Sequence, residues 1–431
     1  MVSNPRWYRP GWLRSAAAAG AIAAMLGAAS PAAARPAAGA AAAGWPQLQG
    51  GASHTGDEAG ENSVTAANAG QLIPAWHQAL SDSWPGTEPA VTGGVVYVGS
   101  GDGVTAFDAA SGSQLWQAVL PGEVTGTPAI QDGMALIAMD ASSTTGGFIS
   151  GKGYVVALDA STGAIVWQKI VGQPTPLRFL AGATSVTTTP SRAYFSSARG
   201  RPVVYALDIH TGRILWRTQV PLDPCGISDP SVSGSLVVVG SDSAVTALNA
   251  ANGTQAWQDT FDSDASCTDS VENWIPAISQ GTVYAGTHLD GVAGISLATG
   301  TVLWDDKSLG NVPGPLSLTS NAVITTPLNS EGDGQGLVAL NRSDGSVLWE
   351  NSMSPEDGTA IFGSLAWGAV FTNSNFRRAV AFGRLGGHTV GSTPSYLIGG
   401  YPPELPPVVS AGRVYVISSN KLICFTLPGA S

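Results

Sequence analysis

Positive charge and cysteine are both scarce in this chain. Its 431 residues include 19 lysines and arginines against 30 aspartates and glutamates, a net charge of −11. A surface of this sign disfavours nucleic acid and anionic lipid. The three cysteines include no adjacent pair and no Cys-x-x-Cys-His motif, which excludes a c-type haem attachment site. The five histidines are dispersed, and none forms a recognisable catalytic pair with a serine or cysteine.

The first 34 residues have the composition of a secretory signal peptide. Arg6, Arg9 and Arg14 form a positive stretch, residues 16–29 are apolar, and residues 32–34 are a small-residue cleavage site. There is no Arg-Arg pair for twin-arginine export and no cysteine nearby for a lipid anchor. We expect Sec-type export and no stable membrane insertion; an uncleaved anchor stays open as the alternative. Residues 35–44 form a low-complexity linker.

An eleven-residue unit recurs along the rest of the chain. Its clearest copy places Asp159, Gly163 and Trp167 at fixed distances after Ala157. β-branched and aromatic residues flank an Asp-to-Gly turn, which predicts a hairpin in each copy. The tryptophan that ends the hairpin needs an apolar contact and an indole partner from a neighbouring repeat. The expected docking residues are Trp76, Trp116, Trp167, Trp216, Trp257, Trp304 and Trp349, with Gly112, Gly163, Gly212, Gly253, Gly300 and Gly345.

A repeat of roughly 40 to 50 residues with four short strands is typical of a β-propeller. Eight further strand segments lie outside the repeated units, at 95–98, 134–139, 193–196, 236–239, 282–285, 322–325, 369–372 and 413–417. They predict an all-β, eight-bladed propeller that spans residues 45–431 as one domain. The strand that carries Trp76 precedes the first blade, and we expect it to complete the last blade and close the ring.

The Ala-x-Asp-x-x-x-Gly-x-x-x-Trp spacing resembles the tryptophan-docking motif of pyrroloquinoline-quinone (PQQ) type propellers. The resemblance covers the chain from Trp45 to Leu427. It implies the fold but no single activity, because such propellers include quinoprotein alcohol dehydrogenases, an outer-membrane assembly scaffold lipoprotein and secreted proteins without known activity. The dehydrogenases hold PQQ with a bridge between adjacent cysteines and a tryptophan, and bind calcium with Glu, Asn and Asp. This chain lacks the adjacent cysteines.

The loops that lead into the innermost strand of each blade are expected to line one mouth of the central channel. They include residues 87–89, 188–190, 228–230 and 274–276, and most of their residues are small or carry hydroxyls. Glu88, Asp229 and Trp274 depart from that pattern and are our candidates for binding a cation or a planar or sugar-like ligand. The alternative is that they are ordinary rim residues. The arm from Trp45 to Asn62 contains His54 and Asp57, which could form a metal site or an acid–base pair. The resemblance to PQQ-type propellers implies instead that the arm packs across the last blade, and we favour this structural role.

The cysteines are placed informatively. Cys225 and Cys267 occupy equivalent loops on adjacent blades, and we expect a disulfide between them in an oxidising compartment. Cys424 falls in the last strand and is interpreted as a core residue. Asp262 and Asp264 begin like a calcium loop but lack its later ligands, so only an irregular calcium site stays open.

The sequence favours a secreted, non-catalytic scaffold in the cell envelope or outside the cell. Its expected partner is an envelope or extracellular protein or polymer, and we expect a monomer without a cofactor. Two alternatives stay open. One is an alcohol or sugar dehydrogenase dependent on PQQ and calcium, with Glu88, Asp229 and Trp274 at its site. The other is a carbohydrate-binding propeller with Trp84, Trp274 and Trp367 as exposed aromatic residues.

Overall fold

The structure is a computed structural model of the whole chain. It describes residues 44–429 apart from 59, 62, 82–86, 102, 121, 142–152, 172–183, 198–201, 221–225, 242, 262–274, 287–290, 313–314, 328–335, 352–359, 363–364, 374–375, 384–387, 393, 395, 398–405 and 419. The expected signal peptide therefore lies outside the described residues. Residues 42–431 form one compact unit, which is an all-β propeller. In the described part of the chain, no helix combines the length and the hydropathy needed to span a bilayer.

Each sheet of the propeller is built mainly from strands that follow one another in sequence, and eight sheets occur among the described residues. The first contains β3 (Ala90–Thr92), β4 (Val95–Ser100), β5 (Gly103–Asp108) and β6 (Gln114–Val119). The second contains β7 (Gly122–Val124), β8 (Ala129–Gln131), β9 (Met134–Ala141), β10 (Gly153–Asp159) and β11 (Ile165–Val171). The third contains β12 (Thr187–Thr189), β13 (Arg192–Ser196), β14 (Val203–Asp208) and β15 (Ile214–Gln219).

The fourth to sixth sheets have the same four-stranded order. They contain β16 (Ser231–Ser233), β17 (Leu236–Gly240), β18 (Ala244–Asn249) and β19 (Gln255–Thr260); β20 (Ala277–Ser279), β21 (Thr282–Gly286), β22 (Val292–Ser296) and β23 (Val302–Asp306); and β24 (Ser317–Leu318), β25 (Ala322–Thr325), β26 (Leu337–Asn341) and β27 (Val347–Asn351). The short 3-10 helices are η1 (Leu48–Gly50), η2 (Ala69–Gln71) and η3 (Lys307–Leu309).

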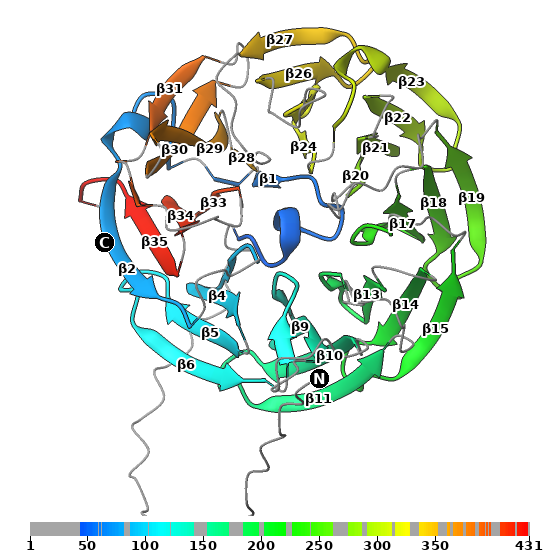
Figure 1. Ribbon diagram of the computed structural model, residues 1–431, viewed down its shortest axis with the longest axis horizontal. Helices are drawn as coiled ribbons and strands as arrows, with labels where there is room; N and C mark the ends of the chain where they lie inside the picture. Colours follow the sequence, from blue (N-terminus) through cyan, green and yellow to red (C-terminus); the bar gives the residue numbers. More distant parts are fainter. Residues whose placement is uncertain are drawn as a thin grey trace, which may run out of the picture. The chain divides into compact units, whose positions relative to one another are not determined.

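The last two sheets combine strands from the two ends of the chain. One joins β1 (Asp57–Glu58) to β28 (Ala360–Phe362), β29 (Leu365–Asn373), β30 (Phe376–Gly383), β31 (Thr389–Ser392) and β32 (Tyr396–Leu397). The other joins β2 (Ile73–Ala79) to β35 (Lys421–Thr426), β34 (Arg413–Ser418) and β33 (Val408–Ser410). The sheets follow one another around a common centre in chain order (Figure 1). The eight strand segments expected from the sequence fall in the second main strand of each sheet, which confirms them.

The middle and outermost strands of a blade differ in their hydrophobic pattern because they differ in burial. Middle strands face a neighbouring sheet on both sides, so they are continuous apolar runs: Leu136, Ile137 and Met139 of β9 are fully buried. Outermost strands have one face toward solvent and alternate in burial, as β11 does. Apolar residues of the blades therefore contribute to a core that lies between the sheets.

The expected docking tryptophans contact the turn of the following repeat. Trp116 donates its indole N–H to the carbonyl of Ala160 at 3.0 Å, and its ring lies against Gly163, which has φ +74°. The Asp159 carboxylate accepts hydrogen bonds from the amides of Ser161 and Thr162 and holds that turn. Equivalent indole bonds of 2.8–3.1 Å join Trp76 to Ala109, Trp167 to Ile209, Trp216 to Ala250, Trp257 to Leu297 and Trp304 to Arg342.

Substituting alanine for Gly163 tests how much this contact stabilises the fold. A Cβ there would lie 2.5 Å from the Trp116 ring, so the ring has to move as well as the backbone. We expect a loss of about 2–4 kcal/mol of unfolding free energy, from overpacking added to a positive φ. The matched control is Gly133→Ala, because Gly133 has φ +78° with no atom near its Cβ position. Urea unfolding should show that the control loses only about 1 kcal/mol; equal losses would contradict the packing argument.

Candidate functional site

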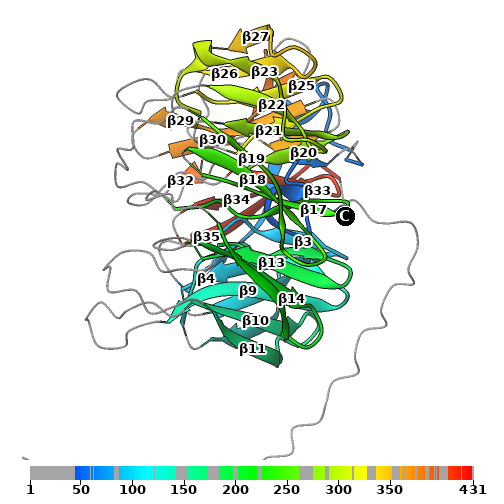
Figure 2. The same cartoon turned by 90° about the vertical axis from the view of Figure 1, so that its right-hand side faces the viewer.

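The N-terminal arm, residues 45–58, occupies the centre of the propeller. Both views show η1, in blue, at the centre of the sheets (Figure 1 and Figure 2). The arm runs past the middle residue of one innermost strand after another. Its backbone carbonyls accept hydrogen bonds of 2.6–2.9 Å from the amides of Val91, Ile130, Val232, Ile278 and Leu318. The Gln47 side chain accepts from the amide of Thr188 at 2.8 Å, and β1 pairs with β28.

The expectation that the arm packs across the last blade holds only in part: Trp45 shares a core cluster with residues of that blade and Glu61 accepts from the amide of Gly412, but the arm also contacts the innermost strands of other blades. An innermost strand has an open edge toward the channel, and the backbone amides on that edge need acceptors when they are buried. The arm supplies those acceptors in sequence order. Its pattern in the sequence, glycines and polar residues without strand periodicity, gave no signal of this path.

Glu88 lies beneath the arm and is only 2% exposed. Its Oε2 accepts from the indole of Trp45 at 3.2 Å and from the amide of Gln49 at 3.4 Å, while its Oε1 accepts from the Gln49 side chain at 3.1 Å. Burial raises the pKa of Glu88 to about 7, against the smaller opposite effect of these hydrogen bonds. Glu88 therefore holds its proton in mildly acidic solution.

A protonated Glu88 also bears on how the side-chain amide of Gln49 is oriented. The side-chain oxygen of Gln49 is buried and has no hydrogen-bond partner. The two ends of a glutamine amide are assigned from the hydrogen-bond network rather than seen directly. If the amide is turned over, its oxygen accepts the carboxylic O–H of Glu88, and its NH2 group takes the place of the oxygen that lacks a partner.

Asp229 is the second buried acid of the channel, at 6% exposure, and its Oδ1 has no hydrogen-bond partner. Burial raises the pKa of Asp229 to about 7; Ser185 and Thr184 lower it, and the charge of Glu88 raises it further. The two acids are linked by an arc of hydrogen bonds. The amide of Glu88 donates to the Thr127 hydroxyl at 3.0 Å, and the amide of Thr127 donates to the Ser185 hydroxyl at 3.2 Å.

This arc corrects the third loop expected from the sequence. Residues 187–189 form β12, so Thr188-Thr189-Pro190 lies at the end of the innermost strand rather than before it. Residues 184–186 occupy the position equivalent to Thr87-Glu88-Pro89. In the neighbouring blades a proline directly precedes the innermost strand, but the third blade has Val186 at that position. Because Pro190 was taken for the equivalent proline, the loop was predicted four residues too late.

His54, on the arm, is buried between two innermost strands. Its Nε2 lies 3.1 Å from the Thr187 hydroxyl and its Nδ1 3.0 Å from the Ser231 hydroxyl. Both hydroxyls also face backbone carbonyls, of Pro230 and Pro276. Burial lowers the pKa of His54 to about 3, so the ring is neutral and donates its single N–H to one of the two hydroxyls. His54 fastens the arm, as the structural interpretation expected.

Other residues singled out in the sequence fall outside this site or outside the described part of the chain. Trp274, Cys225 and Cys267 fall outside the described residues, so the ligand role of the first and the disulfide of the other two stay predictions. The prediction for Cys424 is confirmed: it is fully buried, and it pairs with Trp76 as Ala339 pairs with Trp349. Among the described residues, no three His, Cys, Asp or Glu side chains gather as metal ligands would.

Comparison with known proteins gives the family. Residues 60–169 and 151–314, together more than half of the chain, match the family model described as outer membrane protein assembly factor BamB, which consists of PQQ-type repeats. The chain belongs to this family. The resemblance to PQQ-type propellers is thereby confirmed.

Curated relatives have more than one activity. BamB of Yersinia pestis is 28% identical over 216 residues, 47% of this chain and 53% of that protein. A tetrathionate hydrolase of Acidithiobacillus ferrooxidans is 26% identical over 47% of this chain and 40% of its own length. The quinohemoprotein alcohol dehydrogenase ADH IIB of Pseudomonas putida is 31% identical over 37% of this chain and 24% of its own. The chain thus spans about half the length, or less, of these relatives.

Solved structures support the fold. The crystal structure of BamB from Moraxella catarrhalis superimposes with a TM-score of 0.59 at 18% identity, covering 82% of this chain and 99% of that one. The quinohemoprotein alcohol dehydrogenase ADHIIG from Pseudomonas putida HK5 gives a TM-score of 0.70 at 15% identity, covering 90% and 81%. At these identities the likeness concerns the propeller fold alone.

The described channel residues do not fit PQQ with calcium. A carboxylate that binds calcium gives its oxygens to the ion. Both oxygens of Glu88 instead accept hydrogen bonds from the arm, and the raised pKa keeps the group protonated in mild acid. Asp229 offers one unused oxygen. Binding the cofactor here would require displacing Trp45 and Gln49.

Proposed function

We propose that this chain is an extracytoplasmic, non-catalytic scaffold of the BamB-like family that binds another envelope protein. The observation that carries the proposal is the arm in the channel. The position at which a propeller of this kind would take a ligand is filled by the chain's own residues. Glu88 accepts hydrogen bonds from two of them, Trp45 and Gln49. A rigid body of this kind serves by presenting its loops and outer strands to a partner.

The proposal includes an architecture and a location. We propose an eight-bladed ring closed by the N-terminal strand, supported by eight sheets among the described residues and by the pairing of β2 with β35. Residues 1–34 are proposed as a Sec-type signal peptide, followed by the linker at 35–44. The curated relatives named as outer membrane protein assembly factors support a partner that takes part in the assembly of envelope proteins.

The first test is a cofactor titration. The purified chain without residues 1–34 is titrated with PQQ and calcium, followed by tryptophan fluorescence and by dye-linked oxidation of simple alcohols and sugars. We expect no saturable binding at high micromolar PQQ and no turnover, because Trp45 and Gln49 already occupy Glu88 in the channel. Saturable binding with turnover would overturn the scaffold proposal and favour a quinoprotein dehydrogenase. Free PQQ with denatured protein is the control for non-specific quenching.

A further inference from the structure

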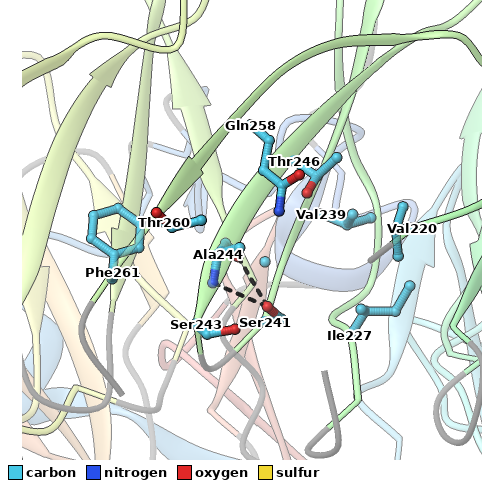
Figure 3. A pocket seen from close by; sticks show the side chains of 11 residues that line it. Val220, Ile227, Val239, Ser241, Ser243, Ala244, Thr246, Gln258, Thr260 and Phe261 are labelled. Carbon is cyan, nitrogen blue, oxygen red and sulfur yellow. Dashed lines mark hydrogen bonds between the residues drawn. The ribbon is translucent and has the colours of Figure 1, made fainter. Parts of the chain in front are cut away.

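A cavity of about 140 Å³ lies against the fourth sheet, beside the connection from the third sheet, and none of its lining residues belongs to the arm or the buried acids. Figure 3 shows its lining residues: Phe261 stands on one side, Val220, Ile227 and Val239 on the other, and polar side chains lie between them. None of the described residues that line it is charged. An enclosed apolar cavity of about 150 Å³ holds benzene, whereas this cavity is partly open to solvent, so a larger ring can extend out of it.

At two positions that line the cavity, the fourth sheet lacks an aromatic pair that the third sheet has. In the third sheet, Phe195 of β13 faces Tyr205 of β14 in register, and their rings stack at 4.9 Å. The equivalent positions of the fourth sheet hold Val239 of β17 and Thr246 of β18, again in register. Two small side chains replace two large ones, and the space that the rings would fill stays open.

The polar groups in this cavity have unused hydrogen-bonding capacity. Thr246 and Gln258 are register partners on β18 and β19, and Thr260 follows on the same face. Thr246 is 4% exposed, yet its hydroxyl makes no hydrogen bond within the described part of the chain, and neither does the Gln258 amide. The Thr246 oxygen is not among the fully enclosed side-chain atoms that lack a partner, so water or a ligand in the cavity can reach it.

We propose that this cavity binds one neutral, hydroxylated six-membered ring, of the class of a pyranose unit. An apolar ring would leave Thr246 and Gln258 without partners. To an ion the described lining residues offer hydroxyl and amide groups but no opposite charge. A pyranose can contact both the apolar and the polar residues of the cavity. Its C–H face packs on Val239 and Ile227 or on Phe261, and its hydroxyl groups bond to the Thr246 hydroxyl and the Gln258 amide. This site is independent of the proposed scaffold role.

The test uses the full mature chain and methyl β-D-glucopyranoside and methyl α-D-mannopyranoside as probes, with toluene and glucuronate for comparison. Saturation-transfer NMR and titration measure binding. We expect saturable binding of a methyl pyranoside, no binding of toluene, and weaker binding of glucuronate. Absence of pyranoside binding at tens of millimolar, or binding of toluene alone, would overturn the proposal.

Matched variants assign the binding to this cavity. Thr246→Tyr introduces the residue type that the third sheet carries at the same place, so it fills the cavity with a side chain that this type of blade accommodates. We expect it to abolish binding. Gln258→Ala should weaken binding by about tenfold, the loss of one or two hydrogen bonds.

Gln117→Ala is the control for these variants. Gln117 faces Thr105 in the first sheet as Gln258 faces Thr246 here, but it does not line this cavity. We expect its affinity for the methyl pyranosides to equal that of the parent chain. Unchanged affinity in both Thr246→Tyr and Gln258→Ala would rule out the site.

Discussion

Replacing Trp45 with alanine is expected to lower the unfolding free energy by about 4–6 kcal/mol. Removal of a fully buried tryptophan costs about 3–5 kcal/mol, and the loss of the indole leaves buried Glu88 with one donor fewer, which adds about 1 kcal/mol or more. Trp45 also fixes the start of the arm, since its backbone exchanges two hydrogen bonds with Val91. Urea unfolding followed by circular dichroism measures the change.

Two further variants separate the parts of this effect. Trp45→Phe keeps most of the apolar contact and removes only the indole donor, so it should cost about 1–2 kcal/mol. Val119→Ala, at an outermost position that is 70% exposed, should change stability by less than about 0.5 kcal/mol. Amide hydrogen exchange at Ile130, Val232 and Ile278 should accelerate in Trp45→Ala, because their acceptors are carbonyls of the arm. A loss below about 1 kcal/mol with unchanged exchange would mean that the arm is only loosely attached.

The repeat made most of the fold predictable. The spacing of Asp159, Gly163 and Trp167 encodes local structure, because a turn needs a side-chain acceptor and a residue with positive φ at fixed places. Strand segments such as 134–139 were equally clear, since burial on both faces demands an unbroken apolar run. These signals are short in range, and each can be recognised within a few residues.

The channel was harder to predict because its geometry depends on contacts between distant residues. Glu88 stood out in the sequence as a departure from small loop residues, but its partner Trp45 is 43 positions away and belongs to an arm without periodic signal. A carboxyl that faces solvent and one that fastens an arm have the same sequence context. Ser185 was missed for a related reason: the loop before β12 lacks the proline that marks its equivalents.

The second large effect is an unusual dependence of stability on pH. The folded chain keeps the protons of Glu88 and Asp229 up to a pH of about 7, whereas an unfolded chain releases them at the ordinary pKa values of 4.5 and 3.8. Between these values unfolding releases protons, so raising the pH favours the unfolded state. The stabilising contribution of each carboxyl is fully present below its unfolded pKa and is lost as the pH passes about 7. It is on the order of 3 kcal/mol for Glu88 and about 4 kcal/mol for Asp229.

His54 acts in the opposite direction. Its pKa is lowered from 6.5 to about 3 in the folded chain, so unfolding takes up one proton between these values, and stability falls as the pH falls. From pH 4.5 to 6.5 the two carboxyls release more protons on unfolding than His54 takes up. Of these three groups the carboxyls therefore dominate, and we expect the unfolding midpoint in urea to decrease from about pH 4.5 to about pH 7.5.

The double variant Glu88→Gln/Asp229→Asn should reverse the sign of this dependence. It removes both carboxyl protons and leaves His54, so stability should rise with pH between about 4.5 and 6.5. The amide that replaces the Glu88 carboxyl can still accept from Trp45 and donate to the turned amide of Gln49, which keeps the arm in place. Urea unfolding midpoints measured across this pH range give the slope for the parent chain and the variant.

Asp344→Asn is the control for that reversal. Hydrogen bonds from Ser346 lower the pKa of this exposed carboxyl, so it titrates below the window, and its removal should leave the slope unchanged. A double variant whose slope equals that of the parent chain would mean that Glu88 and Asp229 are ionised and solvated at neutral pH. Both carboxylates would then be available to a cation. This result would contradict the argument that Glu88 and Asp229 do not fit calcium and PQQ.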